Sequence, residues 1–289
     1  MAWVNDVIQG ILLGGLYALF AAGLSLVFGV MRLVNLAHGD LSILAAYLAL
    51  VIVTPLGINP FLTIPIVMVV MAGTGYVLQR GLLNRALDEG VLPPILVTFG
   101  ISIIIQNLLL EGFTANSRGL DAGVIEARAV TITEQVAIGW FPLLTMVTAV
   151  VVLLALHLFL TRTRTGRAFR ATSDHQRAAQ LMGINNRHLY GLATALALAM
   201  VALAGIFVGI RTTFSPFSGP LLLIFAYEVV IIGGLGSLWG TLIGGFLLGI
   251  AQTIGAHIDQ GWGVLAGHLL FLAILAFRPT GLFAKQVDA

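Results

Sequence analysis

The feature that most constrains the fold of this chain is a series of long apolar segments that carry almost no charge. The first, 7–30, contains no charged residue after Asp6 and ends shortly before Arg32. Only 9% of the 289 residues are charged, and the mean hydropathy is +1.04, far above that of ordinary soluble domains. Because a membrane-spanning helix needs roughly 20 apolar residues, these segments predict an all-α integral membrane protein with several spans.

Charges, prolines and glycines divide the chain into about nine apolar segments, each of which we expect to be a helix. The count is eight if 221–239 or the second segment enters the membrane and returns on the same side, and a broken first helix would raise it. No lysine or arginine precedes the first segment, so we expect that segment to remain in the mature protein. The expected segments are 7–30, 41–53, 59–79, 93–110, 136–160, 189–210, 221–232, 241–255 and 262–277.

The polar residues between the fifth and sixth segments form an arginine-rich island, 161–190. Six of the 14 lysines and arginines lie there, against one acid, Asp174. Loops of this kind belong on the cytoplasmic side of a membrane. Alternating spans then predict that the N-terminus and the loops 111–135 and 212–220 lie outside. The segment 189–210 after the island is dense in alanine and glycine, so we expect a closely packed central helix.

The island is predicted to contain a short helix, 174–182. Ser173 and Gln176 have the spacing of a capping box, and Gly183 provides a C-terminal stop. Such a short helix is unstable alone, so the membrane surface, the rest of the chain or another protein must receive it. The alternative is a basic loop that only fixes topology. The apolar residues on one face of the predicted helix are Ala178, Leu181 and Met182.

Several stretches of the sequence resemble one family of transporters. The island is similar to the cytoplasmic coupling loop of ABC importer permeases, specifically the LivH-type permeases for branched-chain amino acids. The stretches 23–40 (GLSLVFGVMRLVNLAHGD) and 233–240 (GGLGSLWG), and the ending 278–283 (RPTGLF), are also similar to that family. Arg177 stands where the importer signature has glutamate, so that signature is matched in part. The island residues that carry the resemblance are Gly166, Arg170, Ala171, Ala178, Ala179 and Gly183.

The resemblance implies a type II-like helical bundle that forms a single permease domain, 1–289, in the bacterial cytoplasmic (inner) membrane. It implies four kinds of partner: a second permease subunit, similar rather than identical; two cytoplasmic ATPase subunits; an extracytoplasmic solute-binding protein; and membrane lipid. ATP and Mg would bind the ATPase subunits, and no cofactor is expected in this chain. The residues expected to couple to the ATPases are Gly166, Arg170, Ala171, Asp174, Arg177, Ala178, Ala179 and Gly183.

The expected solutes are branched-chain or other hydrophobic amino acids. Similar permeases carry urea, short amides or aromatic acids, so the same fold with one of those solutes is an alternative. An ion-coupled secondary transporter is a further alternative from a different class. It would need charged groups in several spans and an inverted repeat, whereas this sequence offers essentially Glu228 alone and no detectable repeat.

Four polar residues are candidates to line the translocation pathway. Asn35, His38 and Asp40 interrupt two apolar segments, where polar backbone at membrane depth lines a cavity or is buried in protein. A cytoplasmic turn with Asp40 as a helix N-cap is the alternative. Glu228 lies within an expected span, where a carboxylate is costly, and its alternative role is a hydrogen bond to a neighbouring helix. We expect His268 to be interfacial or satisfied by a neighbour.

The sequence offers no motif for catalysis by this chain. It contains no cysteine, no nucleophile elbow and no metal-binding HExxH, and the sparse His and Asp residues form no metal site. A net charge of +2 does not indicate nucleic-acid binding. Glycines spaced by four indicate helix packing and not a phosphate loop, since no Lys-Ser/Thr follows them. These glycines are Gly236, Gly240, Gly244, Gly245 and Gly249.

Overall fold

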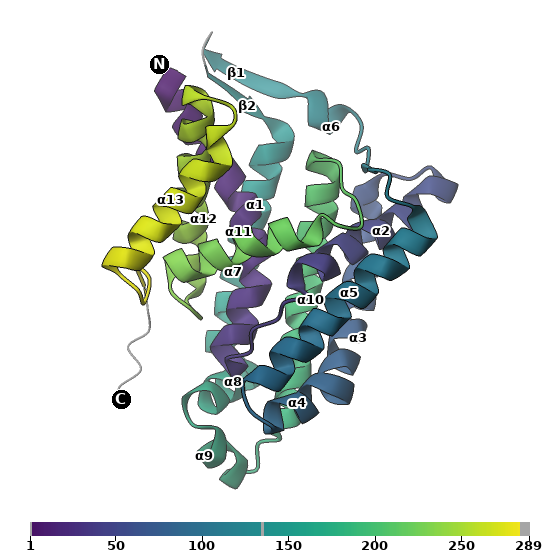
Figure 1. Ribbon diagram of the computed structural model, residues 1–289, viewed down its shortest axis with the longest axis vertical. Helices are drawn as coiled ribbons and strands as arrows, with labels where there is room; N and C mark the ends of the chain where they lie inside the picture. The colour runs from purple at the N-terminus through teal and green to yellow at the C-terminus, as the bar shows by residue number, and fades with distance from the viewer. Residues whose placement is uncertain (1, 134–135, 284–289) are drawn as a thin grey trace. The chain divides into compact units, whose positions relative to one another are not determined.

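The computed structural model describes residues 2–133 and 136–283, and helices make up nearly all of its regular structure (Figure 1). In the described residues, seven helical segments are long and apolar enough to cross a membrane: Trp3–Met31, His38–Leu56, Pro60–Asp88, Leu92–Phe113, Trp140–Arg162, Asn186–Arg211 and Leu238–Ile258. Two further apolar helices are shorter, α11 (Gly219–Gly233) and α13 (Trp262–Phe277). Together these helices account for all nine expected segments and confirm an all-α polytopic membrane protein.

These spans correspond to the named helices with one composite exception. α1 is Ala2–Met31, α2 is His38–Leu56, α5 is Leu92–Phe113, α7 is Trp140–Arg162, α10 is Asn186–Arg211 and α12 is Leu238–Ile258. The third span joins a 3-10 turn η1 (Pro60–Thr63), α3 (Ile64–Leu78), a π-helical turn η2 (Gln79–Leu83) and α4 (Asn84–Asp88). Its start is fixed by Asn59, whose side chain accepts a hydrogen bond from the Phe61 amide at 3.0 Å.

The predicted outer loop before α7 contains structure that the apolar pattern does not indicate. β1 (Ala129–Thr133) and β2 (Val136–Gly139) form an antiparallel hairpin after the short helix α6 (Val124–Ala127). The prediction that the fifth segment is helical from residue 136 is therefore wrong. The helix begins at Trp140, whose amide donates to the Arg128 carbonyl at 3.0 Å and so closes the hairpin.

The chain folds into two compact units, each built from segments distant in sequence. Unit 1 contains 1–25, 122–153 and 225–289, and unit 2 contains 26–121 and 154–224. In unit 1, the backbones of α1 and α12 touch, because a Cβ added at Gly249 would lie 2.2 Å from the Gly10 carbonyl oxygen. α12 and α13 also lie side by side in this unit (Figure 1). The expectation of a single permease domain stays a prediction.

In unit 2, α10 is the central helix, as its alanine and glycine content predicts. In its apolar 18-residue stretch, 83% of the residues are buried inside the protein. It packs against α2 and α3 at glycine contacts: a Cβ at Gly205 would lie 2.2 Å from the Ser42 carbonyl oxygen, and one at Gly75 would lie 2.8 Å from that of Thr194. Large apolar side chains on α3 and α5, among them Val69, Leu96 and Leu108, point outward and are suited to contact lipid.

Candidate functional site

The first half of the arginine-rich island forms a helix, α8 (Arg164–Asp174), that turns back sharply from the end of α7. Thr163 caps it by accepting a hydrogen bond from the Gly166 amide at 2.9 Å. A Cβ at Gly166 would lie 2.2 Å from the Phe159 carbonyl oxygen, so the turn requires glycine there. Phe169 is fully buried and contacts the Phe159 ring edge-on at 6.1 Å. The island is therefore a folded element and not a free loop.

The predicted capping box of Ser173 and Gln176 is wrong. The Ser173 hydroxyl instead donates to the Gly29 carbonyl of α1 at 2.5 Å, and the Gln176 amide nitrogen bonds to the Tyr190 hydroxyl. Extended backbone at His175 separates α8 from a second helix, α9 (Gln176–Leu181). The predicted helix 174–182 thus begins two residues late, because tertiary hydrogen bonds hold the polar side chains that would have capped it.

α9 ends as the glycine predicts. Gly183 has a φ of 84°, its amide donates to the Gln180 carbonyl at 2.9 Å, and the Ile184 amide donates to the Ala179 carbonyl at 3.0 Å. This pair of bonds is a Schellman motif, which favours glycine at the left-handed position. The motif fixes the direction in which the chain leaves α9 and returns to α10.

The tip of this helix presents apolar side chains to solvent. Leu181 is 89% exposed and Met182 is 83% exposed. Ala179 faces inward and is only 4% exposed, so the expectation that it contacts a partner directly does not fit its position. Gly166 is also buried. The other residues predicted to couple to the ATPases are exposed on α8 and α9 or just after α9. They are Arg170, Ala171, Asp174, Arg177, Ala178 and Gly183.

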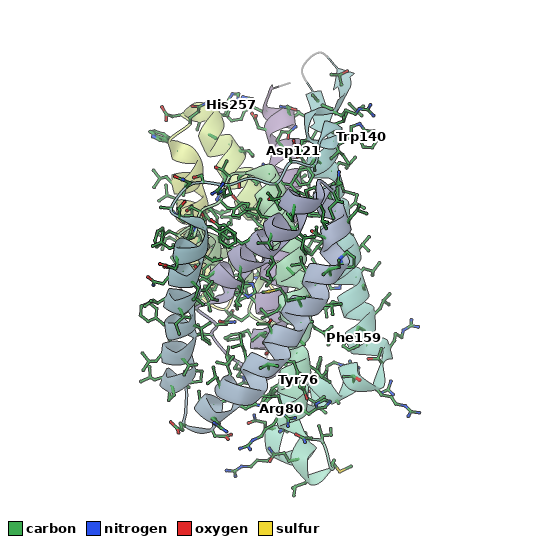
Figure 2. The ribbon with its side chains drawn as sticks, turned by 90° about the vertical axis from the view of Figure 1, so that its right-hand side faces the viewer. Tyr76, Arg80, Asp121, Trp140, Phe159 and His257 are labelled. Atoms are coloured by element: carbon green, nitrogen blue, oxygen red, sulfur yellow. The ribbon has the colours of Figure 1, made fainter. Side chains whose placement is uncertain are left out.

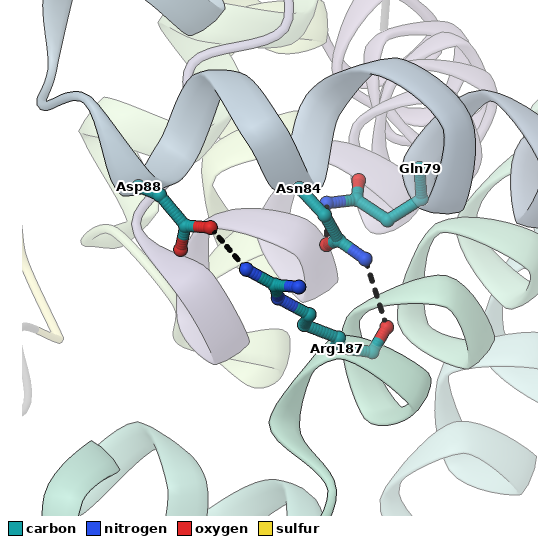
Figure 3. Close-up of polar contacts among 4 residues, drawn as sticks. All are labelled: Gln79, Asn84, Asp88 and Arg187. Atoms are coloured by element: carbon teal, nitrogen blue, oxygen red, sulfur yellow. Dashed lines mark hydrogen bonds and ion pairs between the residues drawn. The ribbon is translucent and has the colours of Figure 1, made fainter.

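A polar network fixes the start of α10, directly after the loop, to the end of the third span (Figure 3). The Asn84 amide donates to the Arg187 carbonyl at 3.1 Å and accepts from the Gln79 amide at 3.0 Å. The Arg187 guanidinium pairs with Asp88 at 2.5 Å, and the Thr194 hydroxyl donates to Gln79 at 2.8 Å. Gln79 and Asn84 are buried and bonded, so this junction is rigid.

One turn away, an aromatic contact extends the same junction. Figure 2 shows Tyr76 and Arg80 close together on the third span. The Arg80 guanidinium lies 5.9 Å from the centre of the Tyr76 ring. The Tyr76 hydroxyl lies 2.8 Å from Nδ1 of His188 on α10. The loop is therefore held at its α10 end by the Tyr76–His188 contact as well as by the polar network, whereas the cation–π pair lies within the third span.

The polar interruption before α2 is buried in unit 2. The Asp40 carboxylate accepts from the Ser102 hydroxyl at 2.5 Å and from the Gln106 amide at 3.0 Å, both on α5. The alternative that Asp40 is an N-cap is wrong, since α2 starts at His38 and Ala37 holds the cap position. Asp40 lies in the first turn, where the helix dipole stabilises a carboxylate.

Asn35 and His38 support the same turn. The Asn35 side chain accepts from the Ala37 amide at 3.0 Å, and the Leu36 amide donates to the Thr98 hydroxyl of α5 at 3.1 Å. Both Asn35 and His38 are buried in this unit. The arrangement ties α2 to α5, and whether it also contacts solute stays a prediction.

Glu228 lies on α11 in unit 1, only 3% exposed. Its Oε1 atom pairs with Nδ1 of His268 on α13, so the alternative of a hydrogen bond to a neighbouring helix is realised in the structure. His268 lies near the middle of α13 rather than at its end. The sequence places each residue in an apolar helix but does not indicate that the two meet.

The spaced glycines divide into three groups. A Cβ at Gly240 would lie 2.1 Å from the Gly233 carbonyl oxygen, and one at Gly244 would lie 2.4 Å from that of Val229, so these positions allow α11 and α12 to touch. Gly245 and Gly249 make the same kind of approach to α1. Gly236 differs: it has a φ of 79° in the turn before α12, where it serves the turn and not helix packing.

The comparison with protein families agrees with this arrangement. The model of the family described as the permease component of branched-chain amino acid transport systems matches residues 7–275, nearly the whole chain. The chain belongs to this family.

Curated relatives of this permease cover almost its full length. It is 29% identical to the high-affinity branched-chain amino acid transport system permease protein BraD of Pseudomonas aeruginosa, over 98% of this chain and 96% of the relative. It is 27% identical to LivH of Escherichia coli K12 over the same shares. A probable LivH permease of Methanocaldococcus jannaschii is 29% identical over 94% of this chain and 90% of that one. No solved structure gives a significant match.

Sequence reasoning missed two polar residues of the permease that the structure places near Glu228. The Tyr17 hydroxyl on α1 donates to Oε1 of Gln252 on α12 at 2.6 Å. Each is an isolated polar side chain in an apolar helix, which is the signal that could have identified them. Their partnership depends on a contact between residues 235 positions apart, which no local pattern contains.

Proposed function

We propose that this chain is the transmembrane permease subunit of an ABC importer, which receives branched-chain or other hydrophobic amino acids from a solute-binding protein. A separate pair of ATPase subunits drives the transport, and a second permease subunit completes the pathway. The names of the full-length relatives support the solute class. The seven long apolar helices and the two shorter ones provide the membrane-embedded part.

The observation that carries this proposal is the exposed apolar tip of α9. Leu181 and Met182 project from a short helix whose two ends are both fixed, by the Schellman motif and by the bonds of Gln176. Burying a leucine or methionine side chain stabilises a contact by about 1.5–3 kcal/mol, so a partner protein gains by covering this tip. A fixed helix also transmits a displacement of its partner without deforming.

Two grooves beside the loop give that partner room to approach. One, of about 530 Å³, lies between the end of α1 and α8–α9, and the other, of about 450 Å³, lies between α1 and the α4–α5 turn. Arg32, Gln176 and Tyr190 line both grooves. Arg32 has a φ of 53°, an uncommon conformation for a side-chain-bearing residue, which directs the chain between the two grooves.

The test is Leu181→Glu in the complex purified from native membranes. We expect the variant to fold, because Leu181 contacts little of its own chain, but to lose the ATPase subunits that co-purify with the unaltered permease. A buried unpaired charge costs several kcal/mol, which corresponds to at least a hundredfold weaker association. Mass spectrometry of the purified complex identifies the subunits retained.

The matched control is Leu92→Glu, a change at a comparably exposed apolar residue at the start of α5 that lines neither groove. It should retain the ATPase subunits. If Leu181→Glu retains them too and transports normally, the coupling role of α9 is wrong.

A further inference from the structure

Glu228 belongs to a buried polar cluster drawn from four helices of unit 1. It pairs with His268 of α13, while Tyr17 of α1 donates to Gln252 of α12. The Phe225 ring of α11 joins the two pairs, because its centre lies 5.2 Å from that of Tyr17 and 6.2 Å from that of His268. The coupling loop uses none of these residues.

Two atoms of this cluster are buried and unpaired among the described residues. Oε2 of Glu228 accepts no hydrogen bond, and Nε2 of Gln252 donates none. Each buried group left unsatisfied costs about 1–3 kcal/mol, so a native protein keeps two together only for a reason. One is a carboxyl oxygen that can accept and the other is an amide nitrogen that can donate, which is the pattern that an amino-acid zwitterion complements.

The surroundings of Glu228 favour a cation. Within the described residues no lysine or arginine forms an ion pair with it, and it pairs with the His268 ring. Phe225 and Tyr17 are aromatic, and the faces of such rings attract an ammonium group. A carboxylate at membrane depth without a permanent counter-charge is suited to bind a transient one.

His268 opens the cluster to the surface of unit 1. Its side chain is 35% exposed near the middle of α13. The residues one turn away on either side, Val264 and Leu272, are apolar and exposed. An ionisable group facing lipid at this depth is costly, so this edge suits a path along which solute passes. The His268 ring, which pairs with Glu228, is therefore the part of the cluster that a ligand would meet first from this surface.

We propose that this cluster is a subsite for the ammonium group of the transported amino acid, with Glu228 as its acceptor and Gln252 as a donor to its carboxylate. The identity of the ligand rests on the proposed function. The transporter needs such a contact to be weak, since a solute held tightly in the pathway would not leave it.

The natural absence of cysteine makes the subsite testable by thiol labelling. In purified His268→Cys permease, the cationic reagent aminoethyl methanethiosulfonate should react about tenfold faster than the anionic sulfonatoethyl reagent, after correction for their rates with a free thiol. Glu228→Gln in the same background should abolish that preference. Equal rates with Glu228 present, or reaction only with the neutral methyl reagent as at a lipid-facing site, would overturn the proposal.

Leu272→Cys provides a second position that leaves the cluster intact, in case loss of His268 impairs folding. We expect the same preference there, and its absence at Leu108→Cys on α5, an exposed apolar control. Excess L-leucine should slow labelling of Leu272→Cys, whereas 4-methylpentanoate, which lacks only the amino group, should not. Equal slowing by both compounds, or by neither, would contradict ammonium recognition.

These measurements need no ATPase and no binding protein. Failure of Leu181→Glu to release the ATPase would therefore contradict the proposed function alone. Failure of the labelling preference would contradict the subsite alone.

Discussion

At the residue scale, the glycines of α12 mark places where two helix backbones meet without space for a side chain. A Cβ at Gly249 would lie 2.2 Å from the Gly10 carbonyl oxygen and 2.6 Å from the Gly14 amide nitrogen, and backbone atoms cannot move aside cheaply. We expect Gly249→Ala to destabilise unit 1 by about 1–3 kcal/mol or more, seen as a lower Tm in detergent. Gly73→Ala on α3 is the control, because a Cβ there meets nothing within 4 Å. Equal shifts in Tm would contradict the contact.

The same residues show what spacing alone can predict. Glycines four apart correctly indicate close approach at Gly240, Gly244, Gly245 and Gly249, because one helix face repeats at that interval. The pattern misassigns Gly236, since a glycine at positive φ in a turn has the same letter and a similar interval. The positive φ of Gly236 follows from its place after the end of α11, and the spacing of glycines does not indicate where that helix ends.

At the element scale, the break between α8 and α9 follows from a bond to a distant helix. The Ser173 hydroxyl donates to the Gly29 carbonyl, 144 residues away in the sequence. We expect Ser173→Ala to weaken the attachment of α8 by about 1 kcal/mol and to speed hydrogen exchange of the amides in 164–182. Thr165→Ala, which removes from the same helix a side chain that forms no hydrogen bond among the described residues, should leave the exchange unchanged. Faster exchange in both variants would mean that helix propensity and not the anchor sets local stability.

Element boundaries could be predicted wherever a local signal decides them. The Gly183 stop and the limits of α13 follow from the sequence, because glycine conformation and apolar length are local properties. The hairpin of β1 and β2 could not be predicted, since Val136–Gly139 is as apolar as the helix that follows. Pairing with Ala129–Thr133 decides its structure, and the apolar pattern contains no information about that partner.

At the scale of the whole molecule, the alternating spans predict that α9 and the hairpin lie on opposite sides of the membrane. Two single-cysteine variants test this, Met182→Cys on the loop and Val130→Cys on β1, both at exposed positions. An impermeant thiol reagent added to intact cells should label Val130→Cys only, and Met182→Cys should react after the cells are opened. Labelling of Met182→Cys from outside would reverse the topology.

The class of the molecule was predictable and its polar interior was not. Nine apolar segments and one basic island determine a polytopic membrane protein because the bilayer imposes length and charge rules on any chain. The partners of Glu228 and Asp40 lie on other helices, so their meeting depends on the packed fold. Their apolar surroundings mark both carboxylates as unusual in the sequence, but no local pattern indicates that His268 pairs with Glu228 or that Ser102 donates to Asp40.

The described chain ends in a segment whose backbone forms hydrogen bonds with the end of α11, about fifty residues earlier in the sequence. The amides of Leu282 and Phe283 donate to the carbonyls of Ile232 and Gly233 at 2.9 and 3.1 Å, and Gly281, at a φ of 83°, leaves no space for a side chain beside Ile231. During synthesis these bonds form only after α12 and α13 have been made, because both helices lie between the bonded residues in the sequence. A chain that stops before Leu282 therefore leaves the Ile232 and Gly233 carbonyls at the end of α11 without these two donors.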